Sequence, residues 1–149
     1  MGFLSIRGKI LLSFFTGIFI FILVSALLQV SAKSALNKSF YLNYVFELGN
    51  SIKRLQSIAI ESIQFKDEKI IQESGREEIE KIIQNLEKLK SLKGIEKEVE
   101  ELNDAVFEYI ASVGKVIKEE AEIDKVWESA NRLNFAQQNL KDAIVKTSY

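Results

Sequence analysis

The chain has 149 residues, with 20 basic and 21 acidic side chains and a formal net charge of −1, and it contains neither His nor Cys. Without His and Cys, the chain alone cannot form a zinc or haem site, a Cys nucleophile or a His general base. Its glycines stand singly, so no phosphate-binding loop is present. Its lysines alternate with glutamates, which argues against nucleic-acid binding. We therefore expect a protein that is not an enzyme and holds no metal or cofactor.

The amino-terminal segment has the composition of a membrane anchor. The first 46 residues include no acidic side chain, and the run ILLSFFTGIFIFILVSALLQV from Ile10 to Val30 is uncharged. As a helix, this run would reach roughly 30 Å, the thickness of one bilayer core. The sequence therefore predicts a transmembrane helix over 10–30, with the lipid bilayer as a partner.

The charges beside this run predict its orientation. Arg7 and Lys9 precede it, and Lys33 and Lys38 follow it. Short basic amino-terminal tails usually stay in the cytoplasm. We therefore expect a cytoplasmic tail over 1–9 and a single pass through the inner (cytoplasmic) membrane. Residues 31–149 would then form an extracytoplasmic domain.

The amino terminus has two other interpretations. Small residues at 24–26 and 30–32 would suit a signal peptidase, but signal peptides have apolar regions of only about 7–15 residues, so an uncleaved anchor is favoured. The Gly2-Phe3 pair also resembles the start of a type IV pilin. That class would need a glutamate shortly afterwards, where this chain has Ile6 and Arg7.

The rest of the chain has the pattern of an all-α protein. Pro is absent, Gly is rare, and apolar residues recur at spacings of three and four. The first helix is expected to continue from the membrane to about Lys66. Its seam consists of Tyr41, Val45, Leu48, Ile52, Leu55 and Ala59. Leu42, Phe46 and Ile60 add a second apolar edge, which predicts contacts with more than one neighbour.

A second helix is predicted to start at Ser74. The run from Ser74 to Glu77 matches a capping box, in which serine and glutamate side chains satisfy free amides at a helix start. Gly94 would end this helix as a left-handed residue. The seam of the helix consists of Ile79, Ile82, Leu86 and Leu89.

Two further seams follow, and they differ in phase by more than about 120° at 100° per residue. The third consists of Ile95, Val99, Leu102, Val106, Ile110, Val113 and Ile117, and the fourth of Val126, Ala130, Leu133, Gln137, Leu140 and Ile144. Residues 118–124 contain neither Gly nor Pro, so either a polar turn or one long helix fits; the turn is favoured. The fold predicted is a transmembrane helix continuing into an antiparallel up-down bundle of the four-helix-bundle type.

Two stretches resemble the amino-terminal half of a bacterial transmembrane chemoreceptor, a methyl-accepting chemotaxis protein. The segment LSIRGKILLSF from Leu4 to Phe14 is similar to that family's entry into its first membrane helix. The stretch from Leu102 to Lys118 is similar to the middle helices of its two-storey helical sensors. Sensor histidine kinases use the same type of input domain. The resemblance implies an extracytoplasmic ligand-binding domain that forms a homodimer and signals by helix displacement.

The chain departs from that family at its carboxyl end. Chemoreceptors continue into a second membrane helix, a HAMP linker and a cytoplasmic signalling hairpin, whereas this chain ends at Tyr149. We expect either a truncated receptor, which stops before its second transmembrane helix, or a stand-alone anchored bundle. Methylation sites and the kinase-contacting tip have no counterpart to be assigned here.

The resemblance also implies how a small anionic ligand would be bound. Sensors of this kind grip carboxylates with arginines between helices, because the guanidinium fork matches a carboxylate. Arg54 and Arg132 are the candidates, although solvated arginines explain both as well. Trp127, with Tyr109 and Phe107, would line a pocket or belong to the core or a dimer surface. Gln137, a polar residue in an apolar seam, would fix helix register or mark a small cavity.

Two classes of function are consistent with these features. The first is a ligand-sensing input region of a signalling receptor, which the amino-terminal resemblance favours. The second is a membrane-anchored structural or scaffolding bundle. The sequence does not identify a ligand, and a further apolar segment beyond residue 149 would favour the first class.

Overall fold

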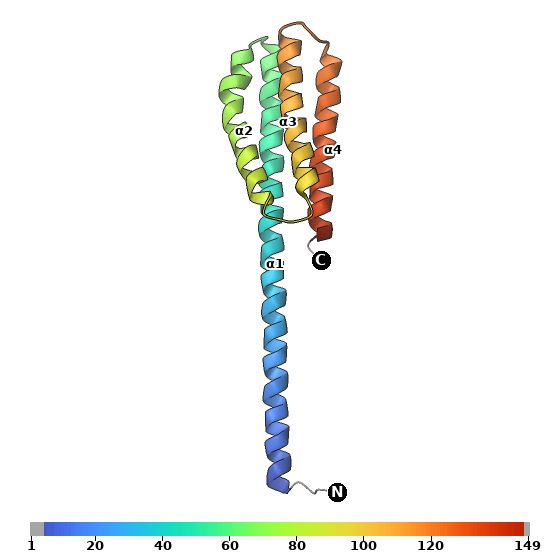
Figure 1. Cartoon of the computed structure of the whole chain (residues 1–149). Coiled ribbons are helices and arrows are strands. Elements are labelled where there is room, and N and C mark those ends of the chain that lie inside the picture. Colours follow the sequence, from blue (N-terminus) through green and yellow to red (C-terminus); the bar gives the residue numbers. More distant parts are fainter. Residues whose placement is uncertain (1–4, 148–149) are drawn as a thin grey trace. The chain divides into compact units, whose positions relative to one another are not determined.

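The computed structural model describes residues 5–147, and these residues form an all-α fold, as predicted. The four helices are α1 (Ile6–Gln64), α2 (Glu68–Leu89), α3 (Glu96–Ile117) and α4 (Ile123–Thr147) (Figure 1). No strand occurs among them. The chain divides into two units, Met1–Ser39 and Phe40–Tyr149. Each unit is described by itself.

The first unit consists of the amino-terminal part of α1. Its apolar side chains between residues 10 and 30 are exposed, among them Phe14, Phe19 and Phe21. Exposing a large apolar side chain to water costs about 1.5–3 kcal/mol relative to burying it. By length and composition, this part of α1 could cross a membrane, a property that signal sequences near an amino terminus share.

The second unit is a bundle whose core is built by all four helices. The seams predicted for α1, α3 and α4 are largely confirmed: Leu48, Leu102 and Leu133 are fully buried. Burying such seams is what stabilises helices that would be marginal alone. The fully buried large side chains are Tyr109, Leu48, Ile52, Leu55, Ile82, Leu89, Ile95, Leu102, Leu133, Leu140, Ile144 and Val99.

The second apolar edge of α1 is covered only in part. Leu42 packs against the core, whereas Phe46 and Ile60 are exposed. Helix α1 does contact more than one neighbour: Arg54 bonds to Glu78 of α2, and Gln56 bonds to Asn134 of α4. Phe46 and Ile60 therefore remain apolar surface of the bundle.

The predicted start of the second helix was wrong. Helix α2 begins at Glu68, and Asp67 is its N-cap: the Asp67 side chain accepts a hydrogen bond from the Lys69 amide at 3.0 Å. Lys66, with φ of 50°, turns the chain just before this cap. Asp is as good an N-cap as Ser, and here the tight turn after α1 places Asp67 at the helix start. Ser74 therefore lies within α2.

Gly94 adopts the predicted left-handed conformation, with φ of 93°, but it does not end the second helix as predicted. Helix α2 ends earlier, at Leu89 with Lys90 as its C-cap, so Gly94 does not cap it. Instead Gly94 lies in the turn before α3, where its amide donates to the Glu96 carboxylate at 3.0 Å.

A polar turn joins α3 and α4, as favoured from the sequence. Helix α3 ends at Ile117, Glu119 has φ of 60°, and α4 begins at Ile123. A continuous helix through this segment is therefore wrong. Without Gly, the left-handed position is occupied by Glu119 at some conformational cost.

Two contacts show the relative direction of α1 and α2. The Tyr41 hydroxyl lies 3.4 Å from the Ser91 hydroxyl, and Arg54 lies 3.3 Å from Glu78. Residue numbers therefore rise along α1 as they fall along α2. Figure 1 shows α2, α3 and α4 beside the part of α1 that belongs to the bundle.

Gly49 and Gln137 form a close contact between α1 and α4. A Cβ atom added at Gly49 would lie 2.6 Å from Nε2 of Gln137, closer than such atoms approach. The Gln137 amide therefore lies directly against the backbone of α1. Glycine within a helix costs about 1 kcal/mol relative to alanine. The close contact with Gln137 explains why a residue without a side chain fits at position 49.

We predict that Gly49 and Gln137 are energetically coupled. Alanine at Gly49 should gain about 1 kcal/mol of helix propensity only when the Gln137 amide no longer occupies that space. The free energy of unfolding should therefore rise with Gly49→Ala in a Gln137→Ala background, and rise less in the native background. Chemical denaturation of the full chain in detergent measures both.

Gly114→Ala in α3 is the matched control for this cycle. A Cβ there would meet only Glu68 Oε1, at an ordinary 3.5 Å. It should gain about 0.5–1 kcal/mol whether or not Gln137 is present. An equal gain from Gly49→Ala in both backgrounds would contradict the coupling.

Candidate functional site

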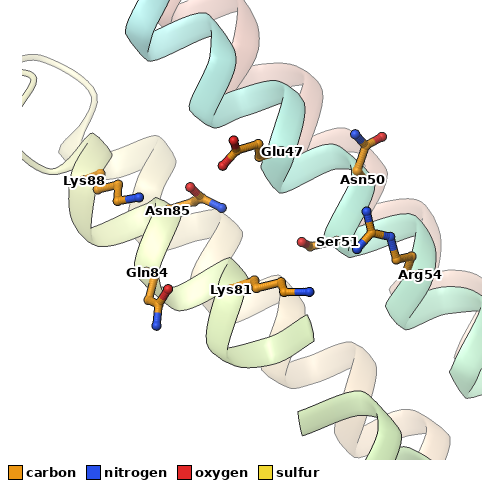
Figure 2. A pocket seen from close by; sticks show the side chains of 8 residues that line it. All are labelled: Glu47, Asn50, Ser51, Arg54, Lys81, Gln84, Asn85 and Lys88. Atoms are coloured by element: carbon orange, nitrogen blue, oxygen red, sulfur yellow. The ribbon is translucent and has the colours of Figure 1, made fainter. Parts of the chain in front are cut away.

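A cavity of about 330 Å³ lies between α1 and α2, and we name it the polar groove (Figure 2). From α1 it is lined by Glu47, Asn50, Ser51 and Arg54. From α2 it is lined by Lys81, Gln84, Asn85 and Lys88. All eight side chains are polar or charged. Figure 2 shows Lys81 and Asn85 reaching from α2 toward α1.

One buried carboxylate, that of Glu78, forms ion pairs with two of the cations that line the polar groove. Glu78 is 7% exposed. Its Oε1 atom lies 3.3 Å from Nη1 of Arg54 and 3.6 Å from Nζ of Lys81. One acid thus serves two cations on different helices. Because Arg54 is 58% exposed, its other guanidinium donors remain accessible to a ligand.

Lys81 has a second acidic partner, at the surface. Its Nζ atom lies 2.9 Å from Oε1 of Glu77. This hydrogen bond raises the pKa of Lys81 and lowers the pKa of Glu77. Lys81 is therefore firmly cationic, and the groove lining has three positive side chains against the single carboxylate of Glu47.

Two buried oxygen atoms near the groove have no hydrogen-bond partner. They are Oε2 of Glu78 and Oδ1 of Asn85, whose residue is 5% exposed. A buried acceptor without a donor costs about 1–3 kcal/mol, and such groups in native proteins call for an explanation. Because Asn85 itself lines the groove, a ligand with a donor group could satisfy it.

The sequence held a signal for these groups that was missed. Glu78, Ile82, Asn85 and Leu89 are spaced by four, three and four residues. Two polar residues thus occupy a buried face of α2. The predicted seam of α2 is confirmed, with Ile82, Leu86 and Leu89 buried and Ile79 packed against the core, but it named only the apolar members of the buried face.

Lys88 is placed by an aromatic contact. Its ammonium lies 5.1 Å from the centre of the Tyr44 ring. Tyr44 in turn packs edge-on against Tyr41 at 6.4 Å between ring centres. A cation–π contact of this kind is worth about 0.5–1 kcal/mol at an exposed site, enough to bias Lys88 toward that end of the groove.

Arg132, the other candidate arginine, lies elsewhere. It forms an ion pair with Glu108 of α3 and approaches Glu128 of its own helix at 3.8 Å. Arg132 therefore has two carboxylates around it and does not line the polar groove. Of the two predicted arginines, the structure places only Arg54 in a cavity with other cations.

Trp127 lies in a second cavity, of about 320 Å³, which we name the apolar groove. Its apolar lining comes from α1 and α4: Ile60, Ile63, Ile123, Val126, Trp127 and Ala130. Side-chain amides complete it: Gln56, Gln64, Asn131 and Asn134. Tyr109 of α3 is the remaining member. No charged side chain lines this cavity.

The four predicted site residues are thus not brought together. Arg54 lies in the polar groove and Trp127 in the apolar groove, whereas Arg132 and Gln137 line neither. Phe107 is exposed and is also absent from both linings. Within residues 5–147, no group of three or more acidic side chains is placed to hold a metal ion.

Comparison of the chain with protein-family models, with curated proteins and with solved structures finds no match in any of the three. The function must therefore be argued from the two grooves and from the exposed apolar segment of α1.

We predict that Tyr109 makes the stability of the bundle sensitive to alkaline pH. Burial raises the pKa of Tyr109 from 10.0 to about 12. The unfolded chain then loses this proton at lower pH than the folded chain does. The stabilising contribution is full below pH about 10 and is lost as pH rises toward about 12, by at most about 2.7 kcal/mol.

Chemical denaturation at a series of alkaline pH values measures this loss. Tyr109→Phe should remove this part of the pH dependence, because phenylalanine has no proton to lose. Tyr41→Phe, which removes a hydroxyl outside the core, is the matched control and should keep the parent profile. Identical profiles for the parent and Tyr109→Phe would contradict the assignment.

Proposed function

We propose that the chain is the extracytoplasmic ligand-sensing input region of a transmembrane receptor of the chemoreceptor type. Residues 10–30 would anchor it in the cytoplasmic membrane, with residues 1–9 inside and the bundle outside. The observation that carries the proposal is the polar groove: Arg54 of α1 and Lys81 of α2 meet over the buried Glu78. The groove thus offers cationic donors from two helices to one ligand.

A small carboxylate is the ligand class that fits this groove best. The guanidinium fork of Arg54 matches a carboxylate bidentately, and Lys81 and Lys88 lie on the facing helix. A volume of about 330 Å³ is at the low end for ligand pockets. A small organic acid therefore fits better than a larger metabolite.

Signalling would follow from the position of this ligand between two helices. An anion held by Arg54 and Lys81 competes with Glu78 for both cations, so it favours a different spacing of α1 and α2. A ligand shifts such an equilibrium only by its difference in affinity for the two arrangements. Arg54 and the anchor belong to one helix, Ile6–Gln64, so a displacement of α1 reaches the membrane segment directly.

A structural or scaffolding role is the second candidate. Large apolar side chains stay exposed on the bundle, among them Phe46, Phe107 and Phe135. A second copy or a partner would cover such side chains. A homodimer would serve either function. Ligand binding in the polar groove separates the two, because a scaffold does not require it.

The first prediction from this proposal concerns topology. The full chain should remain uncleaved, because its uncharged run of 21 residues is longer than a signal-peptide apolar region of about 7–15. A reporter that is active only outside the cytoplasm, fused after Tyr149, should be active, and the mass should be that of the full chain. A cytoplasmic reporter, or cleavage after Ala26 or Ala32, would contradict the anchor.

The second prediction concerns the ligand. Acetate, succinate and citrate should each be tested by thermal unfolding of the full chain in lipid nanodiscs. At about 100 times its dissociation constant, a bound acid stabilises the bundle by about 2.7 kcal/mol. Arg54→Lys keeps the charge but loses the fork, so it should weaken binding at least about tenfold, or 1.4 kcal/mol.

Arg132→Lys is the matched control, because it makes the same change at an arginine outside the groove. It should bind as the parent does. If Arg132→Lys weakens binding and Arg54→Lys does not, the ligand lies elsewhere. If no acid stabilises the bundle, the sensing proposal fails in favour of the scaffold.

A further inference from the structure

The apolar groove is chemically unlike the polar groove. It lies against α1 and α4, at the end of the bundle where α1 finishes and α4 begins, and its lining includes Ile60 and Val126. A charged ligand would lose its hydration there without meeting an opposite charge, which costs several kcal/mol. The cavity therefore selects against the anions that the polar groove favours.

Tyr109 of α3 contributes a hydroxyl group to this cavity. The residue is 2% exposed, yet it belongs to the lining of the groove. The structure records no hydrogen bond for its hydroxyl within residues 5–147, and this oxygen is not among the fully buried atoms that lack a partner, so it reaches the open groove. With a pKa of about 12, the phenol keeps its proton at neutral pH and can both donate and accept.

Some of the neighbouring polar groups are engaged elsewhere. Gln56 of α1 donates to Asn134 of α4 at 3.2 Å. The Ser129 hydroxyl donates to backbone carbonyls of its own helix. An incoming molecule is thus the natural partner for Tyr109.

We propose that the apolar groove binds a small, uncharged, ring-containing molecule whose polar group hydrogen-bonds to Tyr109. The ring would lie on the indole of Trp127, which is 58% exposed at the cavity. Side-chain amides at Asn131 and Gln64 would contact any second polar group. The volume of about 320 Å³ is sufficient for one ring with a short substituent.

The single tryptophan of the chain makes this site directly observable. Trp127 is the only tryptophan, so its fluorescence in the full chain reports on the groove alone. Benzamide and benzoate are the probes, because they share one ring and differ chiefly in charge. Benzamide should change the Trp127 emission with a saturable curve in the millimolar range, the affinity expected for a ligand of about nine heavy atoms. Benzoate should not.

Variants show whether the effect comes from this cavity. Tyr109→Phe removes only the hydroxyl and should weaken benzamide binding about 2–10-fold, the value of one neutral hydrogen bond. Ala130→Leu fills the cavity and should abolish binding, even if Tyr109→Phe proves poorly folded. Phe135→Ala removes an exposed aromatic of α4 outside the lining and is the matched control.

Three outcomes would overturn the proposal: no saturable response to benzamide, an equal response to benzoate, or unchanged binding in Ala130→Leu. Arg54→Lys separates this site from the polar groove. It should leave benzamide binding unchanged, because Arg54 does not line the apolar groove. The test is therefore independent of whether the polar groove binds carboxylates.

Discussion

One helix, α1, combines an apolar segment that could cross a membrane with a buried stripe in the bundle, and the rest of the fold depends on it. Between residues 10 and 30, α1 is apolar on every side. Between Val45 and Ser62 only one face of the same helix is buried. A helix would satisfy all its own backbone groups if the segment 10–30 lay in lipid, and the same helix gives the bundle a long apolar stripe. Helices α2, α3 and α4 are then required to cover that stripe.

The bundle also buries polar groups that do not stabilise it. Glu78 and Asn85 lie in the buried face of α2 with one unpartnered oxygen each. A well-packed apolar pair at these positions would be the more stable choice. Unfavourable polar groups beside an accessible Arg54 are typical of binding sites, where stability is exchanged for recognition.

Sequence periodicity predicted the faces of the helices but not their neighbours. The seams through Leu48, Leu102 and Leu133, and the turn before Ile123, follow from spacing alone because each concerns one helix at a time. The start of α2 was wrong because Asp67 and Ser74 both have capping chemistry, and only the turn after α1 decides between them. Likewise, the sequence could not show that Arg132 lies beside Glu108 while Arg54 opens onto a cavity. These differences depend on how the helices are rotated against one another.

The two grooves share α1 as a common wall, which has a thermodynamic consequence. A carboxylate in the polar groove would act between α1 and α2, whereas a neutral ring in the apolar groove would act between α1 and α4. Both ligands would bias the same helix, so each would change the affinity for the other by an equal factor. The sign depends on whether they favour the same position of α1. Because Gln137 of α4 lies against Gly49, a shift of α1 along α4 would disturb that contact. Losing the contact between Gly49 and Gln137 would therefore oppose any displacement of α1 along α4 that either ligand favours.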